Sequence, residues 1–341
     1  MGAGVSGLAA AWSLSRSGWC STLHEKSRGL AGRAATRRRG EHCYDHGANF
    51  FRLDDAGIHE LLTEHLPANE LVEITGDVWT FDAQGNISPG DPAHNAVSKW
   101  SYRRGIKTIG RLLADDSPHA EVRRESQVTC IDKQDDGWML VDAQGQAHGP
   151  HSILLMTPPA PQSMHLLKDC PAVTAELLAE LGRINYHRQF CFVLGYDSPA
   201  LEHRNYHALL NLDGQHEVSW LSFEEDKAGH VPPGQSVVVV QMSPAWSSPR
   251  YAHEREGLLP EVMEAVCRLL GQDLPEPAWW DSQRWAYARP MNALQPEILQ
   301  KAEAAGLFFA GDATVGKGRV SLALRSGLEV ADRIKARLAC Q

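Results

Sequence analysis

The first eighteen residues, Met1 to Gly18, read MGAGVSGLAAAWSLSRSG and decide the fold. Gly2, Gly4 and Gly7 follow the pattern G-x-G-x-x-G, and the residues after them are rich in alanine and leucine, which favour helix. In such a unit the first glycine permits a tight turn, the second lets the backbone approach a pyrophosphate, and the third lets helix and strand pack closely. The stretch therefore predicts a turn that leads into a helix, with the helix N-terminus facing phosphate groups.

The residues that follow extend this turn and helix toward a βαβ unit. Cys20 to His24 is predicted to form a strand, and Glu25 stands eighteen positions after Gly7, close to where an acid binds a ribose hydroxyl. Only Met1 precedes the first glycine, so the strand that normally opens such a unit is missing. Two explanations stay open: the chain begins inside a longer natural sequence, or the sheet lacks its central strand and binds its cofactor weakly.

Length, composition and charge exclude several classes of protein. A chain of 341 residues predicts about two domains, and 43% hydrophobic with 22% charged residues is typical of a globular protein without a transmembrane helix. The formal net charge of -9 disfavours nucleic acid and anionic membrane as main partners. Seven scattered cysteines without a CxxC pair, and an opening that does not read as a signal peptide, predict a cytoplasmic protein with reduced thiols.

Four further stretches carry a family resemblance. They are SRGLAGR at 27–33, YDHGANFF at 44–51, QRWAYARP at 283–290 and GLFFAGDATVGKGRVSLALRSG at 306–327. Together with the opening unit, they resemble flavin-dependent amine-oxidase-like proteins, specifically the bacterial renalase-like group. The sequence departs from that group at Ala31, which replaces a glycine, and at Ala313-Thr314, where a bulkier pair is usual.

The resemblance implies an α/β fold with a Rossmann-like FAD-binding domain of three-layer ββα character, and a mixed α+β substrate domain. The FAD-binding domain is predicted to comprise residues 1–52, 106–160 and 281–341, and the substrate domain residues 53–105 and 161–280.

Sequence patterns place the main elements within these domains. Strands are predicted in a β-meander that returns to the main sheet (128–131, 137–141 and 152–156), at 307–310 and in a second sheet (218–223 and 237–242). Residues 318–320 should begin a long terminal helix. Helical periodicity at 58–66, 173–181 and 254–270 predicts three helices that cover the second sheet.

For the cofactor, the resemblance implies noncovalent FAD. In the family, residues at the positions of Val128, Thr157 and Asp312 lie near the adenine, the cofactor and the ribitol or phosphate groups respectively, and the start of the terminal helix faces the flavin ring. The predicted cofactor-binding residues are Gly2, Gly4, Ser6, Gly7, Glu25, Lys26, Gly32, Arg33, Gly47, Ala48, Asn49, Val128, Thr157, Pro158, Trp285, Gly311, Asp312, Gly318, Arg319 and Val320.

Three residues are predicted to be catalytic: Asn49, Tyr287 and Arg289. Arg289 precedes Pro290, which favours an extended backbone and allows the side chain to project into a pocket. Its guanidinium is suited to a substrate phosphate or carboxylate, although a structural ion pair is an equal alternative. Tyr287 lies two positions earlier, on the same face of a strand, where it is expected to form a wall of the flavin site.

The resemblance implies hydride transfer to FAD from an isomeric dihydronicotinamide dinucleotide, with reoxidation by oxygen and release of peroxide. A flavin amine oxidase is the enzymatic alternative, and a noncatalytic binding module with weakened FAD binding is the alternative from another class. His42, Cys43 and His46 are the tightest group of soft ligands in the chain, but their spacing is poor for zinc in a turn, so no metal is predicted. The expected partners are a small-molecule substrate and oxygen.

Overall fold

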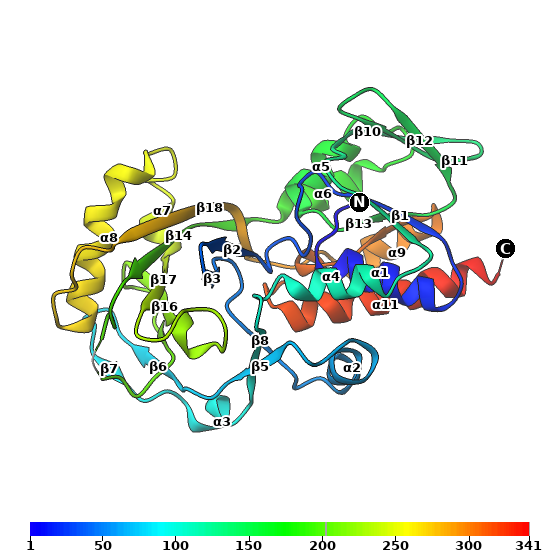
Figure 1. Cartoon of the computed structure of the whole chain (residues 1–341). Coiled ribbons are helices and arrows are strands. Elements are labelled where there is room, and N and C mark those ends of the chain that lie inside the picture. Colours follow the sequence, from blue (N-terminus) through cyan, green and yellow to red (C-terminus); the bar gives the residue numbers. More distant parts are fainter. Residues whose placement is uncertain (202, 341) are drawn as a thin grey trace.

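The computed structural model describes residues 1–201 and 203–340, and it has two lobes (Figure 1). One lobe contains helices α1 (Val5–Arg16), α4 (Thr108–Asp115) and α11 (Val320–Leu338) beside a small parallel sheet, and the other is built on a seven-stranded sheet. Residue 341, the last of the predicted FAD-binding domain, and residue 202 in the predicted substrate domain lie outside the described residues. The predicted domain boundaries remain predictions.

The small sheet consists of short parallel strands. They are β1 (Ser21–His24), β9 (Ala120–Arg123), β13 (Leu154–Met156) and β19 (Leu307–Phe309). Strand β1 pairs with β9 and β13 pairs with β19. The Gly2 N–H donates to the His24 carbonyl at 2.9 Å, and the Thr157 N–H donates to the Met1 carbonyl at 3.1 Å. The first residues therefore lie between the two strand pairs, at the place that the unit reserves for its first strand.

Apolar layers cover both faces of this sheet. On β19, Leu307 and Phe309 pack toward the strands β10 (Val128–Gln134) and β11 (Gly137–Asp142), whereas Phe308 packs toward helices α1 and α11. This alternation follows from the two-residue period of a strand. The helices, the sheet and the meander form three layers, which confirms the predicted fold class.

The meander β10–β11 is confirmed, and a third strand extends it. Strand β12 (Ala147–His151) pairs antiparallel with β11, and it was not predicted. Its sequence AHGPH contains no β-branched or aromatic residue, which explains why propensity alone did not indicate it.

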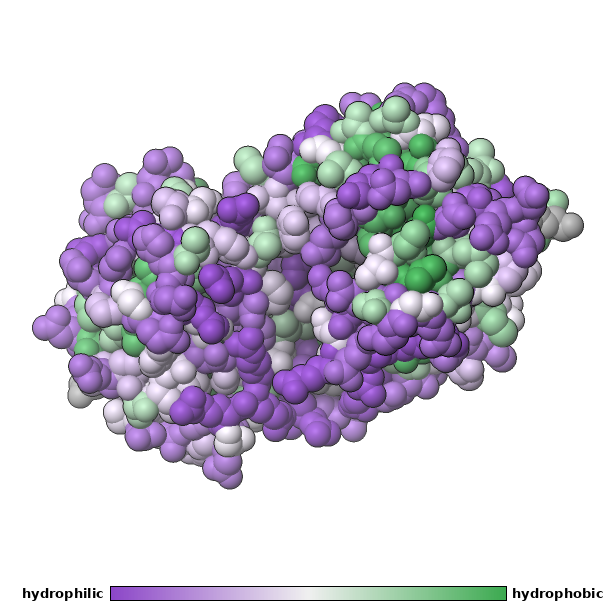
Figure 2. Space-filling model, turned by 90° about the horizontal axis from the view of Figure 1, so that it is seen from above, coloured by the Kyte–Doolittle hydropathy of each residue, from purple (hydrophilic) through white to green (hydrophobic). Residues whose placement is uncertain are grey.

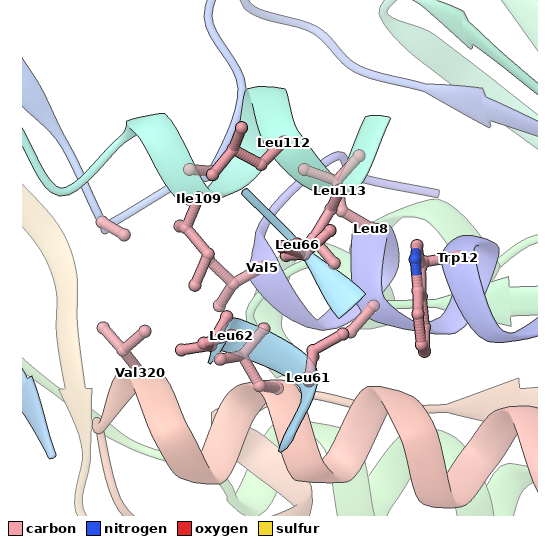
Figure 3. Close-up of a cluster of buried hydrophobic side chains, with 14 of the residues drawn as sticks. Val5, Leu8, Trp12, Leu61, Leu62, Leu66, Ile109, Leu112, Leu113 and Val320 are labelled. Atoms are coloured by element: carbon pink, nitrogen blue, oxygen red, sulfur yellow. The ribbon is translucent and has the colours of Figure 1, made fainter. Parts of the chain in front are cut away.

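A helical core fills the space beside the small sheet (Figure 3). Helix α2 (Ala56–Glu60) continues into the π-helix η1 (Leu61–His65), and η1 packs in one core with α1, α4 and α11. The side chains that meet there are Val5, Leu8, Trp12, Leu61, Leu62, Leu66, Ile109, Leu112, Leu113 and Val320.

The seven-stranded sheet forms the floor of the second lobe. Its strands, in spatial order, are β18 (Trp279–Pro290), β14 (Tyr186–Tyr196), β17 (Ser236–Met242), β16 (Val218–Phe223), β15 (Ala208–Asn211), β6 (Val78–Phe81) and β7 (Ile87–Ser88). Helix α8 (Arg255–Leu270) covers one face through side chains such as Leu258, Val262 and Val266. The predicted second sheet and its helix at 254–270 are confirmed.

The other two helices predicted to cover this sheet pack elsewhere, so that part of the prediction was wrong. The segment 58–66 lies in the core with α1 and α4, and α6 (Ala175–Arg183) packs in the core that contains β13 and β19. A 3.6-residue period reports that a helix has an apolar face, but it carries no information about which element that face meets.

The remaining elements connect and cover these layers. They are β2 (Thr36–Arg39), β3 (His42–Asp45), β4 (Phe51–Arg52), β5 (Leu71–Ile74), α3 (Pro92–Asn95), β8 (Lys99–Tyr102), α5 (Ala160–Leu167), the 3-10 helix η2 (Glu224–Asp226), α7 (Pro244–Ser247), α9 (Pro296–Ala304) and α10 (Asp312–Val315). Within residues 1–201 and 203–340, none of the helices combines the length and the apolar character needed to cross a membrane.

Helices α1 and α11 contact each other backbone to backbone. A methyl group at Gly327 would overlap the carbonyl oxygen of Ser6 and lie 3.0 Å from the Cβ of Ala9. Glycine at this position is what allows the two helices to approach so closely. The contact places the N-termini of both helices on the same side of the lobe.

Substituting Gly327→Ala should therefore lower the free energy of unfolding by about 1–3 kcal/mol, because the added methyl forces the two helix backbones apart. Gly257→Ala is the matched control: Gly257 is an exposed residue of α8 whose Cβ would meet nothing within 4 Å. There the same change should stabilise the helix by up to about 1 kcal/mol. Urea unfolding of both variants measures the difference, and equal effects would contradict the proposed contact.

Candidate functional site

A large cavity lies between the two lobes. Its volume is about 1480 Å³, and it is lined from both sides, by the glycine-rich turn of one lobe and by β14, β16, β17 and β18 of the other. Seen from above, the surface is hollowed between the lobes (Figure 2). Pockets for a single small molecule usually measure about 300–1,000 Å³, so this one has room for a dinucleotide together with a substrate.

All but one of the predicted site residues line this cavity. The exception is Gly7, which is buried behind the turn, and a methyl group there would overlap the carbonyl oxygen of Gly2. Its role is therefore the close packing predicted for the third glycine. The lining residues from the predicted set are Gly2, Gly4, Ser6, Glu25, Lys26, Gly32, Arg33, Gly47, Ala48, Asn49, Val128, Thr157, Pro158, Trp285, Tyr287, Arg289, Gly311, Asp312, Gly318, Arg319 and Val320.

The glycine-rich turn leaves space where a cofactor would need it. Gly2 has a φ of +85°, which few other residues adopt, and a Cβ there would lie 2.8 Å from the Thr157 hydroxyl oxygen. A Cβ at Gly4 would meet nothing within 4 Å. Gly4 is also the N-cap of α1, and no side chain caps the free N–H groups of that helix. An open backbone and uncapped N–H groups fit a pyrophosphate.

Glu25 is held in a defined position at the end of β1. Its two carboxylate oxygens accept hydrogen bonds from the Ala3 N–H at 2.9 Å and the Ser27 N–H at 2.8 Å. Glu25 and Val128 both line the cavity. This is where the βαβ pattern places the acid that binds a ribose.

Arg33 and Asp312 form an ion pair inside the cavity. The Arg33 Nη2 donates to Asp312 Oδ1 at 2.9 Å, Nη1 donates to Oδ2, and the Tyr186 hydroxyl donates to Oδ1 at 3.2 Å. Burial alone would lower the pKa of Arg33, but the Asp312 charge and its hydrogen bonds raise it. Arg33 therefore stays charged, and its pairing with Asp312 leaves little of that charge available to a ligand.

The three predicted catalytic residues differ in how they are held. Asn49 donates to the Asp45 carbonyl at 2.9 Å, and its own carbonyl accepts from Gln241 at 3.1 Å. Tyr287 packs edge-on against a second tyrosine with ring centroids 5.5 Å apart. Arg289 makes no side-chain hydrogen bond or ion pair within the described part of the chain, so the alternative of a structural ion pair finds no support there.

Below Asn49, four fully buried charged residues form a network. Lys227 Nζ donates to Asp45 Oδ2 at 3.0 Å and to Glu224 Oε1 at 2.7 Å, and His230 Nδ1 lies 2.7 Å from Glu224 Oε2. The other His230 nitrogen lies 2.9 Å from the Tyr102 carbonyl. Because both ring nitrogens face acceptors, the imidazole is protonated, and the two positive charges balance the two carboxylates.

This network ties the two lobes together under the cavity. Asp45 belongs to β3 in the YDHGANFF stretch, and Lys227 follows η2 in the connection between β16 and β17 of the seven-stranded sheet. Burial alone would raise the pKa of Asp45, but the charges of Lys227 and His230 lower it. Burial likewise acts to lower the pKa of His230, and its hydrogen bond to Glu224 raises it above the usual value. The cavity wall at 47–49 thus rests on a fixed charge arrangement.

The same cluster contains a set of possible metal ligands. One ligand atom each from Asp45, Glu224 and His230 lies within 4.8 Å of the others. The Lys227 ammonium already lies among them and contacts both carboxylates. The predicted soft-ligand group 42–46 does not gather in the structure: its first four residues form strand β3, where a turn had been expected, and His46 stacks on Trp285 at 5.6 Å.

Several cavity residues were missed by sequence reasoning. Gln189, Trp220 and Gln241 come from three strands of the large sheet, and Phe50 lies 5.8 Å from the Trp220 ring. The sequence offered one signal for Gln241: it is a polar residue directly after the apolar run Val237 to Val240, in a strand that is otherwise almost entirely buried. Phe50 lies in the YDHGANFF stretch but was not predicted as a site residue, and no motif marked Gln189 or Trp220.

Comparisons with known proteins agree with this geometry. Residues 1–64 match a family of NAD(P)-binding Rossmann-like domains, and residues 69–335 match the family of flavin containing amine oxidoreductases. The second match spans most of the chain. The chain therefore belongs to the flavin containing amine oxidoreductase family, and it is an FAD-dependent oxidoreductase.

Solved structures with the same fold have low sequence identity to this chain. A putative protoporphyrinogen oxidase from Exiguobacterium sp. 255-15 superposes with a TM-score of 0.80 at 16% identity, with 98% of each chain covered. A triple mutant of putrescine oxidase gives 0.78 at 13% identity, with the same coverage. A reduced UDP-galactopyranose mutase gives 0.75 at 12% identity over 98% of this chain and 93% of that one. These likenesses establish the fold.

Replacing Lys227 should destabilise the protein strongly. Lys227→Met leaves two buried carboxylates without their shared cation, which is expected to lower the free energy of unfolding by about 3–5 kcal/mol. Lys301→Met is the matched control, because Lys301 forms an exposed ion pair with Glu176. Its loss should lower the free energy of unfolding by less than about 1 kcal/mol. Thermal unfolding of both variants tests this, and a similar loss in each would exclude a stabilising role for the network.

The network also predicts a pH dependence of stability. Because the pKa of His230 is raised in the folded protein, its contribution is complete below the unfolded value near 6.5 and is lost as the pH rises through the raised pKa. The groups that face the imidazole are Glu224, Asp45 and Lys227. We expect the difference in free energy of unfolding between wild type and His230→Gln, measured by urea unfolding, to become smaller as the pH rises from about 6 to 9. A gap that is constant with pH would show that His230 is neutral.

Proposed function

We propose that this protein oxidises an isomeric dihydronicotinamide dinucleotide and belongs to the renalase-like branch of its family. The observation that carries the proposal is the chemistry of the cavity wall formed by the large sheet. Its polar side chains are mainly neutral amides and hydroxyls, among them Gln189, Ser219, Gln241 and Ser243, and Asn49 adds a further amide from the connection between β3 and β4. A dihydropyridine gives up a hydride without first losing a proton, so a wall without a general base suits it.

FAD, when bound, supplies the hydride acceptor for this chemistry. Apart from Arg319, the residues proposed to hold it are those of the predicted cofactor-binding set that line the cavity, with Glu25 toward the ribose and the start of α11 toward the flavin ring. The chain's own contribution to the reaction is then to bind and orient the substrate ring against that acceptor.

Two glutamine side chains are suited to orient a nicotinamide. The amide nitrogen of Gln189 donates to Ser219 Oγ and to the Met242 carbonyl, both at 3.0 Å, and that of Gln241 donates to the Gly47 carbonyl at 2.8 Å. Within the described residues, neither amide oxygen accepts a hydrogen bond, and both residues line the cavity. Two acceptors held in this way fit the N–H groups of a carboxamide.

Aromatic side chains complete the proposed ring site. Trp220, Phe50 and Trp285 line the cavity, and Trp285 Nε1 donates to the His46 carbonyl at 3.1 Å, which fixes its indole ring. Flat apolar faces pack well against a planar heterocycle. The arrangement therefore favours a conjugated ring substrate over a flexible aliphatic one.

An amine substrate is the weaker alternative. An alkylammonium must lose a proton before it can give up a hydride, which requires a base. Among the described residues, Asp213 is the carboxylate on the wall formed by the large sheet. Its two oxygens accept hydrogen bonds from the Ala83 and Gln215 N–H groups at 2.9 and 3.0 Å. It serves a turn at the rim and is poorly placed to act as a base.

The attachment of FAD is proposed to be noncovalent. Seven cysteines are free, and none of them lines the cavity within the described residues. Flavin colour should accordingly move to the supernatant when the protein is denatured. A protein that remains colourless after incubation with FAD would favour the alternative of a binding module that has lost its cofactor.

Anaerobic mixing tests the reaction itself. We expect isomeric dihydronicotinamide dinucleotides to bleach the flavin absorbance, with a rate constant that is flat across roughly pH 6 to 9, because no group on the wall must lose a proton. Putrescine should leave the spectrum unchanged, and free FAD with each substrate is the control for uncatalysed reduction. Reduction by an amine at a rate that rises with pH would overturn the proposal in favour of an amine oxidase.

A further inference from the structure

The cavity carries positive charges that the reaction proposed above does not use. Arg52 from β4 and Arg319, the N-cap of α11, both line it, and Arg319 also borders a small adjacent cavity of about 140 Å³. Neither guanidinium makes a side-chain hydrogen bond or an ion pair within residues 1–201 and 203–340. An arginine that faces a cavity without a carboxylate partner is available to a ligand.

A third cation lies directly beside this pair. Arg52 and Lys99 are opposite residues in the antiparallel pairing of β4 with β8, so their side chains lie on the same face. Lys99 is 2% exposed and also makes no side-chain hydrogen bond or ion pair in the described chain. Like charges placed directly opposite each other destabilise a sheet, and a bound anion would offset that repulsion.

The electrostatic effects agree with this geometry. Burial and the nearby charge of Arg319 lower the pKa of Arg52, whereas Asp54 acts in the opposite direction. Burial lowers the pKa of Lys99, and Arg52 adds to that effect, while Asp77 and Glu73 oppose it. These acids therefore act on the cations only from beyond ion-pair distance.

Asp55, which lines the small adjacent cavity with Arg319, is already engaged in an ion pair. Asp55 accepts from Arg325 at 2.8 Å and caps α2 by accepting from the Ile58 N–H at 3.0 Å. Asp54 lines the cavity but makes no ion pair within the described residues. Within the described residues, Arg52, Lys99 and Arg319 are therefore cations without an ion-pair partner, in a protein whose net charge is -9.

We propose that Arg52 and Arg319 form a phosphate-binding subsite for the substrate, with Lys99 adding positive potential from below. The proposal rests on the proposed function, since it assigns these residues to the phosphate groups of a dihydronicotinamide nucleotide. Guanidinium groups bind phosphate oxygens through paired N–H donors, and each such contact is worth roughly tenfold in affinity. The subsite would select phosphorylated donors over the corresponding nucleoside.

The test compares two substrates that differ only in phosphate. An isomeric dihydronicotinamide mononucleotide carries one phosphate, and its riboside carries none. In the holoenzyme, Arg52→Gln should raise KM for the mononucleotide about tenfold relative to KM for the riboside, and Arg52→Lys should restore most of the difference. Arg333→Gln is the matched control: it removes the same charge from α11, at an exposed pair with Glu303 outside the cavity.

A second measurement does not depend on turnover. Inorganic pyrophosphate should bind the wild-type holoenzyme in a calorimetric titration, about tenfold more weakly to Arg52→Gln, and as in wild type to Arg333→Gln. If Arg52→Gln instead loses FAD on purification, the arginine serves the cofactor phosphates and the proposal is wrong. Equal effects of Arg52→Gln on both substrates, with unchanged pyrophosphate binding, would also overturn it.

Failure of the subsite and failure of the proposed function give different results. If neither nucleotide nor riboside reduces the flavin of the wild-type enzyme, the proposed reaction fails. The pyrophosphate titration then still decides whether the arginines form a phosphate site. If both substrates reduce the flavin with the same KM in wild type, the reaction stands and the subsite is refuted.

Discussion

The backbone contact between α1 and α11 is the constraint on which the site depends. Only hydrogen fits at Gly327 against the Ser6 carbonyl, so the two helices cross at the closest distance that their backbones allow. This contact brings the N-terminus of α1, at Gly4 and Ser6, and that of α11, at Val320, to one cavity. Free N–H groups and two positive helix ends then face the same space, which is the electrostatic requirement for binding a dinucleotide.

The fold of the cofactor side was readable from the sequence because its signals are local. The turn at Gly2, the helix after it and strand β1 are consecutive, and each has a residue pattern of its own. The same holds for strand β19 and the start of α11. What the sequence did not show is which partner an apolar face meets: the segment 58–66 has a clear period, yet it packs on α1 and α4 instead of on the large sheet.

The residues of the site likewise divide into those marked by a local sequence motif and those that only tertiary structure brings to the cavity. Gly32 and Gly47 were predicted as site residues through the family resemblance, because they lie in the stretches SRGLAGR and YDHGANFF that carry it. Gln189 and Gln241 were not, because a single glutamine in a strand has no meaning until strand pairing places it beside the cavity. The buried pair of Lys227 with Asp45 joins residues 182 positions apart, a relation that only tertiary structure creates.

The distribution of charge in the cavity separates structural cations from available ones. Arg33 is neutralised by Asp312, and Lys227 is neutralised by two buried carboxylates, so neither attracts a ligand strongly. Arg52 and Arg319 have no such partner within the described residues. Because the whole protein is negative, an anion gains nothing from long-range attraction. Salt screening also limits the range of the attraction exerted by the arginines to about 8 Å at physiological ionic strength. Recognition of a phosphate here must therefore act at contact, where it lengthens the residence time of the correct substrate more than it speeds its arrival.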